Sequence, residues 1–116
     1  MIVDDSLMAR KMLRKVLMEV GHDVICEAAD GASAVDLFRE LRPDLVTMDI
    51  NMPELNGLEA SRHIHAEFPG ARIVMVTSMC ASEDVRQAAR AGASSYVLKP
   101  FRKERVIEAL ETALKK

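Results

Sequence analysis

An alternation that repeats five times along the chain limits the possible folds more than any other feature of the sequence. Each repeat has a short run of apolar, often β-branched residues and then a longer stretch with helical spacing, which predicts parallel strands joined by crossover helices. The expected strands are residues 1–4, 23–28, 45–49, 72–77 and 95–98, and the expected helices are residues 6–20, 32–41, 58–68, 82–91 and 102–114. A chain of 116 residues has no room for a second core, so we predict one α/β domain over residues 1–116.

Periodicity and capping add two details about the helices. On the first helix an apolar stripe is expected to face the core, and it contains Met8, Met12, Val16, Leu17 and Val20. Ser82 is expected to cap the fourth helix, because a serine hydroxyl accepts a hydrogen bond from the backbone of the first turn.

The composition argues against several classes of function. A net charge of −2 and a pI near 5.9 provide no broad basic surface for nucleic acid or anionic lipid, so no direct nucleic-acid partner is expected. No apolar run is long enough to cross a bilayer and no signal-peptide pattern opens the chain, which predicts no membrane insertion and a cytoplasmic location. Cys26 and Cys80 are too few and too far apart for a disulfide framework or a zinc motif.

Polar residues follow four of the expected strands. Asp4 and Asp5 end the first strand, and the third, fourth and fifth strands end at Asp49, Thr77 and Lys99. The carboxyl ends of parallel strands share one edge of a sheet, where ligands bind. If the first strand lies beside the third, three carboxylates converge and repel one another. Either protons or a hard divalent cation such as Mg²⁺ relieves that repulsion.

Four segments at these strand ends resemble the motifs of response-regulator receiver domains, and the match is nearest to CheY-like chemotaxis members. The segments are Ile2–Ser6, Met48–Gly57, Val76–Ser78 and Tyr96–Phe101. Each motif is short, but their order and their placement at strand ends make the combination specific. The resemblance implies a doubly wound (βα)5, flavodoxin-like three-layer sandwich with the parallel strand order 2-1-3-4-5.

The resemblance also implies a role for each strand-end residue. Asp49 resembles the phosphoacceptor, and Lys99 resembles the lysine that contacts the phosphoryl group. Asp4, Asp5, Asp49 and the backbone carbonyl of Asn51 resemble the ligands of Mg²⁺, for which Mn²⁺ is a possible substitute.

Two further residues resemble the family's switch. Thr77 matches the hydroxyl residue that moves towards the phosphoryl group, and Tyr96 matches the aromatic residue that changes position with it. The peptide bond between Lys99 and Pro100 resembles the family's cis bond.

The implied function is two-component signal transduction, with chemotaxis as the expected process, by a phosphoacceptor that is not a conventional enzyme. A CheA-like histidine kinase is the expected phosphodonor, and a downstream protein is expected to bind the face made by the fourth helix, fifth strand and fifth helix. That face would carry a modest basic patch of Arg86, Arg90, Arg102, Lys103 and Arg105. A monomer is expected.

Three alternatives stay open at this point. Only three residues precede Asp4, so the first strand looks truncated. The first alternative is that the chain is the receiver module of a longer regulator with a DNA-binding or enzymatic output domain, since receiver domains often occur in such proteins. A flavin-binding domain is disfavoured because its phosphate prefers a Gly/Ser/Thr-rich loop where this chain has Asp4 and Asp5. A phosphohydrolase of the haloacid-dehalogenase type resembles DxDx(T/V) after its first strand, which residues 4–7 do not supply.

Overall fold

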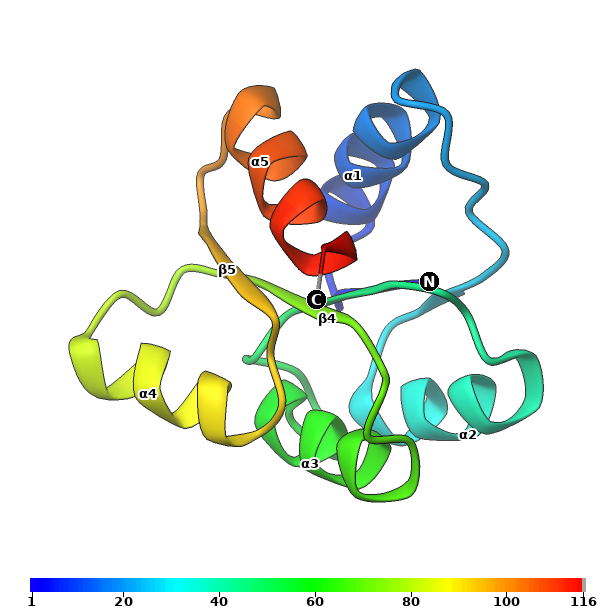
Figure 1. Cartoon of the computed structure of the whole chain (residues 1–116), viewed down its shortest axis with the longest axis vertical. Coiled ribbons are helices and arrows are strands. Elements are labelled where there is room, and N and C mark those ends of the chain that lie inside the picture. Colours follow the sequence, from blue (N-terminus) through cyan, green and yellow to red (C-terminus); the bar gives the residue numbers. More distant parts are fainter. Residues whose placement is uncertain (116) are drawn as a thin grey trace.

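The computed structural model describes residues 1–115 and contains one five-stranded parallel sheet in the order β2-β1-β3-β4-β5. The strands are β1 (Ile2–Val3), β2 (Glu27–Ala28), β3 (Val46–Met48), β4 (Ile73–Thr77) and β5 (Ser95–Leu98). The helices are α1 (Leu7–Glu19), α2 (Gly31–Leu41), α3 (Gly57–Glu67), α4 (Ser82–Arg90) and α5 (Lys103–Leu114). Helices α1 and α5 cover one face of the sheet, and α2, α3 and α4 cover the other (Figure 1). The predicted fold class and strand order are confirmed.

The sheet register brings the ends of β1 and β3 to the same level. Val3 pairs with Ala28 of β2 on one side and with Met48 of β3 on the other. Every residue of β3 and β4 is buried, as expected for central strands of a parallel sheet that is covered on both faces. The residues that follow Val3 and Met48 are Asp4 and Asp49, so the pairing places these two carboxylates side by side.

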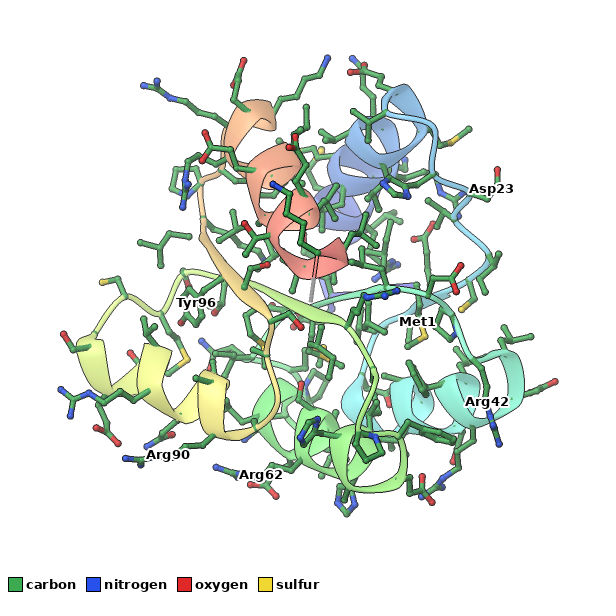
Figure 2. The ribbon with its side chains drawn as sticks, in the orientation of Figure 1. Met1, Asp23, Arg42, Arg62, Arg90 and Tyr96 are labelled. Atoms are coloured by element: carbon green, nitrogen blue, oxygen red, sulfur yellow. The ribbon has the colours of Figure 1, made fainter. Side chains whose placement is uncertain are left out.

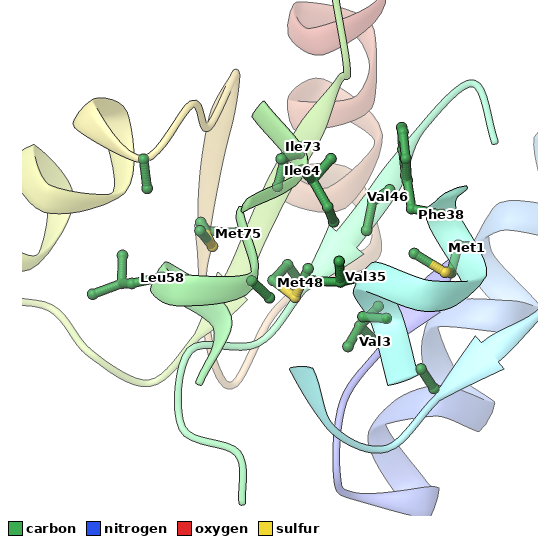
Figure 3. Packing of buried hydrophobic residues seen from close by; sticks show 14 of the residues in the cluster. Met1, Val3, Val35, Phe38, Val46, Met48, Leu58, Ile64, Ile73 and Met75 are labelled. Carbon is green, nitrogen blue, oxygen red and sulfur yellow. The ribbon is translucent and has the colours of Figure 1, made fainter. Parts of the chain in front are cut away.

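Two apolar layers hold the helices against the sheet. The larger lies under α2, α3 and α4 and includes Phe38, Met48, Ile64 and Met75 (Figure 3). The smaller lies under α1 and α5 and is built on Leu13, Val76 and Leu110, among other residues. Burial of these side chains provides the main driving force that fixes the strand ends in place.

The first helix is rotated relative to the predicted stripe. The prediction that Met8, Met12 and Val20 face the core is wrong, since Met8 is 67% exposed and Met12 is 48% exposed. Val16 and Leu17 are buried as predicted, together with Ala9 and Leu13. Leu13 lies four residues after Ala9, so the buried face is a stripe next to the one that the methionines suggest.

The start of α4 is capped differently from the prediction. Ser82 is the first helical residue and not its cap, which is Ala81. The Asp84 carboxylate accepts a hydrogen bond from the Ala81 N–H at 3.1 Å. Asp84 thus makes the half of a capping box that runs from the third helical residue back to the cap residue, and its charge also suits the helix dipole.

The second strand is shorter than predicted. Residues 23–26 do not form strand, and β2 begins only at Glu27. The partner of β2 is β1, which begins at Ile2, so there is little strand for residues 23–25 to pair with. A groove remains beside Met1, lined by residues 21–25 and 41–45, and Figure 2 shows Met1, Asp23 and Arg42 around this region. The truncation of β1 stays a prediction.

Adding three extended apolar residues before Met1 is expected to raise the melting temperature by roughly 3–6 °C, equivalent to about 1 kcal/mol. The Met1 ammonium donates to the Leu45 carbonyl oxygen at 2.8 Å, and burial lowers the pKa of this amino group. An added peptide would keep the N–H donor, remove the buried charge and cover apolar surface. A Gly-Ser-Gly addition measured by thermal unfolding is the control, and equal effects of the two additions would contradict strand extension.

Candidate functional site

The carboxyl ends of β1, β3 and β5 bring together two buried aspartates and a lysine. The Asp4 N–H donates to the Ala28 carbonyl oxygen at 3.0 Å, and the Asp49 N–H donates to the Val3 carbonyl oxygen at 2.9 Å. The Lys99 ammonium donates to Asp4 Oδ2 at 2.6 Å and lies 3.4 Å from Asp49 Oδ2. Asp4 is fully buried and Asp49 is 6% exposed.

Asp5 completes a group of three carboxylates. One oxygen from each of Asp4, Asp5 and Asp49 lies within 4.8 Å of the others, and Asp5 is exposed. Carboxylate oxygens at this spacing are hard ligands, and Mg²⁺ takes one or two protein carboxylates and completes its shell with water and phosphate oxygens. The donor set therefore fits a magnesium ion, one of the two means of relieving the repulsion that the strand-end pattern left open.

Burial and neighbouring charges shift the pKa values of Asp49 and Lys99. Burial is the largest influence on Asp49 and raises its pKa; the Lys99 ammonium offsets part of that rise, and the Asp4 charge adds to it. Burial lowers the pKa of Lys99, but its hydrogen bond to Asp4 and the charges of Asp49 and Asp4 outweigh burial, so the net pKa is raised. One ammonium is shared by two carboxylates, so further positive charge at this edge stabilises the ionised form of Asp49.

The loop between Asp49 and α3 packs so closely that it requires a glycine at position 57. Asn51 is exposed in the loop that leads to α3. The Asn56 side chain accepts a hydrogen bond from the Glu59 N–H at 3.0 Å and so caps α3. Gly57 donates from its N–H to the Ile50 carbonyl oxygen at 2.9 Å, and a Cβ at this position would overlap the carbonyl of Asp49. In the sequence, Gly57 stands out only as the last residue of a motif, and that motif did not predict this contact.

Thr77 and Tyr96 are linked through a residue that the sequence did not single out. Thr77 is buried at the end of β4, and its Oγ1 accepts a hydrogen bond from the Met79 N–H at 3.3 Å. Tyr96 on β5 donates from its hydroxyl to the Met79 carbonyl oxygen at 2.6 Å, and Figure 2 shows Tyr96 on the side of the sheet near α4. Thr77 and Tyr96 are therefore hydrogen-bonded to the N–H and to the carbonyl oxygen, respectively, of the same residue, Met79. No local sequence signal marks Met79.

The chain after β5 turns at Pro100. The Lys99–Pro100 peptide bond is cis, the form that the resemblance implies. The Lys99 N–H donates to the Thr77 carbonyl oxygen at 2.8 Å, which ties the lysine to the end of β4.

The face made by α4, β5 and α5 contains a hollow, and the predicted basic patch on it is largely paired with acids. The hollow is lined by Cys80, Val85, Tyr96, Val97, Leu98, Pro100, Phe101, Arg102 and Arg105. Arg86 and Arg90 lie near Glu83, Lys103 pairs with Glu19, and Arg105 pairs with Glu108. Among residues 1–115, Arg102 is the member of the patch without an acidic partner. The face is therefore less basic than predicted.

The strand-end geometry agrees with a family-level match. The family model described as the response regulator receiver domain matches residues 1–111. This chain belongs to the response-regulator receiver family. It is thus the receiver domain of a signalling protein. Among residues 1–115, no helix of this receiver is both long and apolar enough to span a membrane.

Individual relatives cover nearly the whole receiver. The chemotaxis protein CheY of Thermotoga maritima is 42% identical over 99% of this chain and 96% of its own length. The solved CheX–CheY–BeF₃–Mg²⁺ complex of Borrelia burgdorferi matches with a TM-score of 0.95 at 30% identity, covering 99% of this chain and 87% of that one. The transcriptional regulatory protein DegU of Brevibacillus brevis is 33% identical over 95% of this chain but only 47% of its own length.

Proposed function

We propose that Asp49 is the phosphoacceptor of a CheY-like chemotaxis response regulator. One observation supports this most directly: the Asp49 carboxylate ends a central strand within a group that also contains Asp4, Asp5 and the Lys99 ammonium. A lone loop-capping aspartate has no need of two further acids and a lysine. The Mg²⁺-containing CheY relative is consistent with this chemistry.

In the proposed reaction, an Asp49 carboxylate oxygen attacks the phosphorus of a phosphohistidine on a CheA-like kinase. An O–P bond forms while the N–P bond breaks, and the kinase histidine takes up a proton from water. Lys99 lies beside Asp49 and is placed to neutralise charge on the phosphoryl oxygens. Later attack by water releases inorganic phosphate and restores the carboxylate, so autophosphorylation and hydrolysis both belong to the same site.

The proposed metal ligands are Asp5, Asp49, the backbone carbonyl of Asn51, and Asp4 acting through water. When bound, Mg²⁺ supplies positive charge that holds the acids and the phosphoryl oxygens together. Mn²⁺ is proposed as a substitute because it also accepts oxygen ligands.

The proposed output is a change of protein partner at the face made by α4, β5 and α5. If the Thr77 side chain moves to donate its hydroxyl proton to a phosphoryl oxygen, its Oγ1 would leave the Met79 N–H from which it now accepts a hydrogen bond. The Met79 carbonyl oxygen accepts a hydrogen bond from the Tyr96 hydroxyl. A movement of Met79 would therefore also move Tyr96, which lines the hollow. Phosphorylation therefore biases the face between two states.

The proposed setting is the cytoplasm, with a monomer that receives its phosphoryl group from the kinase and binds a downstream protein, without direct contact to nucleic acid. A second candidate is the receiver module of a longer regulator. The match to about half of DegU favours it, because a receiver of this kind also occurs within a transcriptional regulator.

The test is intact-mass measurement after incubation with acetyl phosphate and Mg²⁺. We expect a gain of one phosphoryl group that EDTA abolishes and that Asp49→Ala lacks. A gain that persists in Asp49→Ala would move the nucleophile elsewhere, and no gain in the wild-type chain would leave a receiver without phosphoacceptor chemistry.

A further inference from the structure

Arg10 lies in the first turn of α1 and contacts two other segments of the chain. Its Nη1 donates to the backbone carbonyl oxygen of Asp4 at 2.7 Å, and its Nε donates to Glu27 Oε1 on β2 at 3.0 Å. The Arg10 side chain is only 17% exposed. Glu27 thus orients the guanidinium, and the guanidinium holds the peptide group that joins Asp4 to Asp5.

The peptide group between Asp4 and Asp5 is planar, so a fixed carbonyl oxygen also fixes the direction in which Asp5 leaves it. Other hydrogen bonds already hold Asp4 in place. Its N–H donates to the Ala28 carbonyl oxygen, and its carboxylate accepts hydrogen bonds from the Ser6 N–H and the Lys99 ammonium. Among residues 1–115, the Asp5 carboxylate has no hydrogen bond or ion pair. Its position therefore depends on its backbone, and the Arg10 contact acts directly on that backbone.

We infer that Arg10 is a positioning residue for divalent-cation binding, because it aims the exposed Asp5 carboxylate into the group formed with Asp4 and Asp49. This inference rests on the proposed function. The charge of Arg10 has an effect on cation affinity that is opposite to that of positioning. A guanidinium near a cation site repels the cation, so if charge alone mattered, removal of Arg10 would strengthen binding. Removal of a residue that orients a metal ligand weakens binding, commonly 10–100-fold. The two effects differ in sign, which makes the role measurable.

Arg14 provides a matched control. Its Nε donates to Glu27 Oε2 at 2.8 Å, from the next turn of the same helix, and among residues 1–115 it makes no contact with Asp4. Arg14→Met and Arg10→Met therefore each remove one cation and one ion pair with Glu27. Only Arg10→Met releases the Asp4 carbonyl.

The experiment is a titration with MgCl₂ of the unphosphorylated full chain, followed by backbone amide NMR shifts because the chain has no Trp. We expect the Mg²⁺ dissociation constant to rise about tenfold in Arg10→Met, to stay within about twofold of wild type in Arg14→Met, and to lie between the two in Arg10→Lys. Melting temperatures in EDTA are measured for all three variants, to separate loss of folding from loss of binding.

Each outcome decides the inference. Weaker Mg²⁺ binding confined to the Arg10 variants, with melting temperatures in EDTA like that of Arg14→Met, supports positioning. Unchanged or tighter binding in Arg10→Met overturns it while leaving the proposed function intact. If Arg10→Met does not fold, Arg10→Lys is compared with Arg14→Met, and equal affinities overturn the inference. If the wild-type chain shows no saturable Mg²⁺ shifts, the inference and the metal site of the proposed function fail together.

Discussion

Asp49→Asn is expected to abolish labelling by acetyl phosphate and, at the same time, to stabilise the fold at neutral pH. The amide lacks the nucleophilic oxygen charge that the reaction requires, so the phosphoryl gain disappears. The second effect follows from burial, which raises the pKa of Asp49 in the folded chain. An ionised Asp49 therefore opposes folding, and an amide of the same shape does not. We expect a gain of about 1 kcal/mol, the size commonly found when a strained functional group is relieved.

The pH dependence of this gain has a definite sign. A carboxyl whose folded pKa is raised favours folding while it is protonated, and that contribution is lost as the pH rises through the folded pKa. In EDTA, wild type and Asp49→Asn should have similar stability below the ordinary aspartate pKa of about 3.9. The wild type should become the less stable of the two as the pH rises from there through the raised pKa of Asp49 in the folded chain, and the difference should stay constant above that pKa.

Denaturant unfolding of both proteins across this pH range measures the effect. Added Mg²⁺ should narrow the gap at neutral pH, because a cation bound to the folded wild type stabilises it by mass action. Mutation of Asp36 to Asn, at an exposed helix position, is the matched control and should change stability little. A wild type that is more stable than Asp49→Asn at neutral pH in EDTA would contradict this account of the site.

Gly57→Ala is expected to destabilise the fold by about 3 kcal/mol and to lower the melting temperature by roughly 10 °C. A Cβ at Gly57 overlaps the carbonyl oxygen of Asp49 and also crowds the Cα of Ile50. Backbone atoms cannot turn away as a flexible side chain can, so the loop or the end of β3 has to move. Intrinsic helix propensity favours alanine over glycine by about 1 kcal/mol, so a loss of stability would identify the clash as the stronger effect.

Gly70→Ala is the control for this substitution. Gly70 is exposed, and a Cβ there meets no atom within 4 Å. Alanine at Gly70 should be neutral or slightly stabilising, because it restricts the unfolded chain. Thermal unfolding of the two variants tests the comparison, and similar melting temperatures would show that the segment around Gly57 moves at little cost. A folded Gly57→Ala should also label more slowly, since the overlap is with the backbone of Asp49, the proposed phosphoacceptor.

Much of the fold could be predicted from local patterns in the sequence. The alternation of apolar runs and helical stretches reports which elements form, because each run must bury its apolar side chains in the same kind of layer. The polar residues after these runs must then lie at one edge of a parallel sheet. This is why the sequence alone predicts that Asp4, Asp49 and Lys99 lie together at one edge of the sheet. The spatial order of the strands came from family resemblance and not from periodicity.

The errors have a common origin in packing. Met8 and Met12 have helical spacing, but the side of α1 that faces the sheet is set by the fit of Leu13 and its neighbours against β-strand residues. Residues 23–25 have strand-like composition, but a strand forms only where a neighbouring strand offers hydrogen bonds. Each of these outcomes depends on a second segment that local patterns do not include.

Local sequence patterns specify the element types, the class of fold and the acids at the strand ends, since these follow from periodicity and from the polar residue that ends each apolar run. The contacts between distant segments become visible only in the folded chain. Arg10 reaches the Asp4 carbonyl and Glu27, Met79 joins Thr77 to Tyr96, and Gly57 touches Asp49. The physical reason is that hydrogen bonds and steric contacts act over a few ångströms in space, whatever the separation of their partners along the chain.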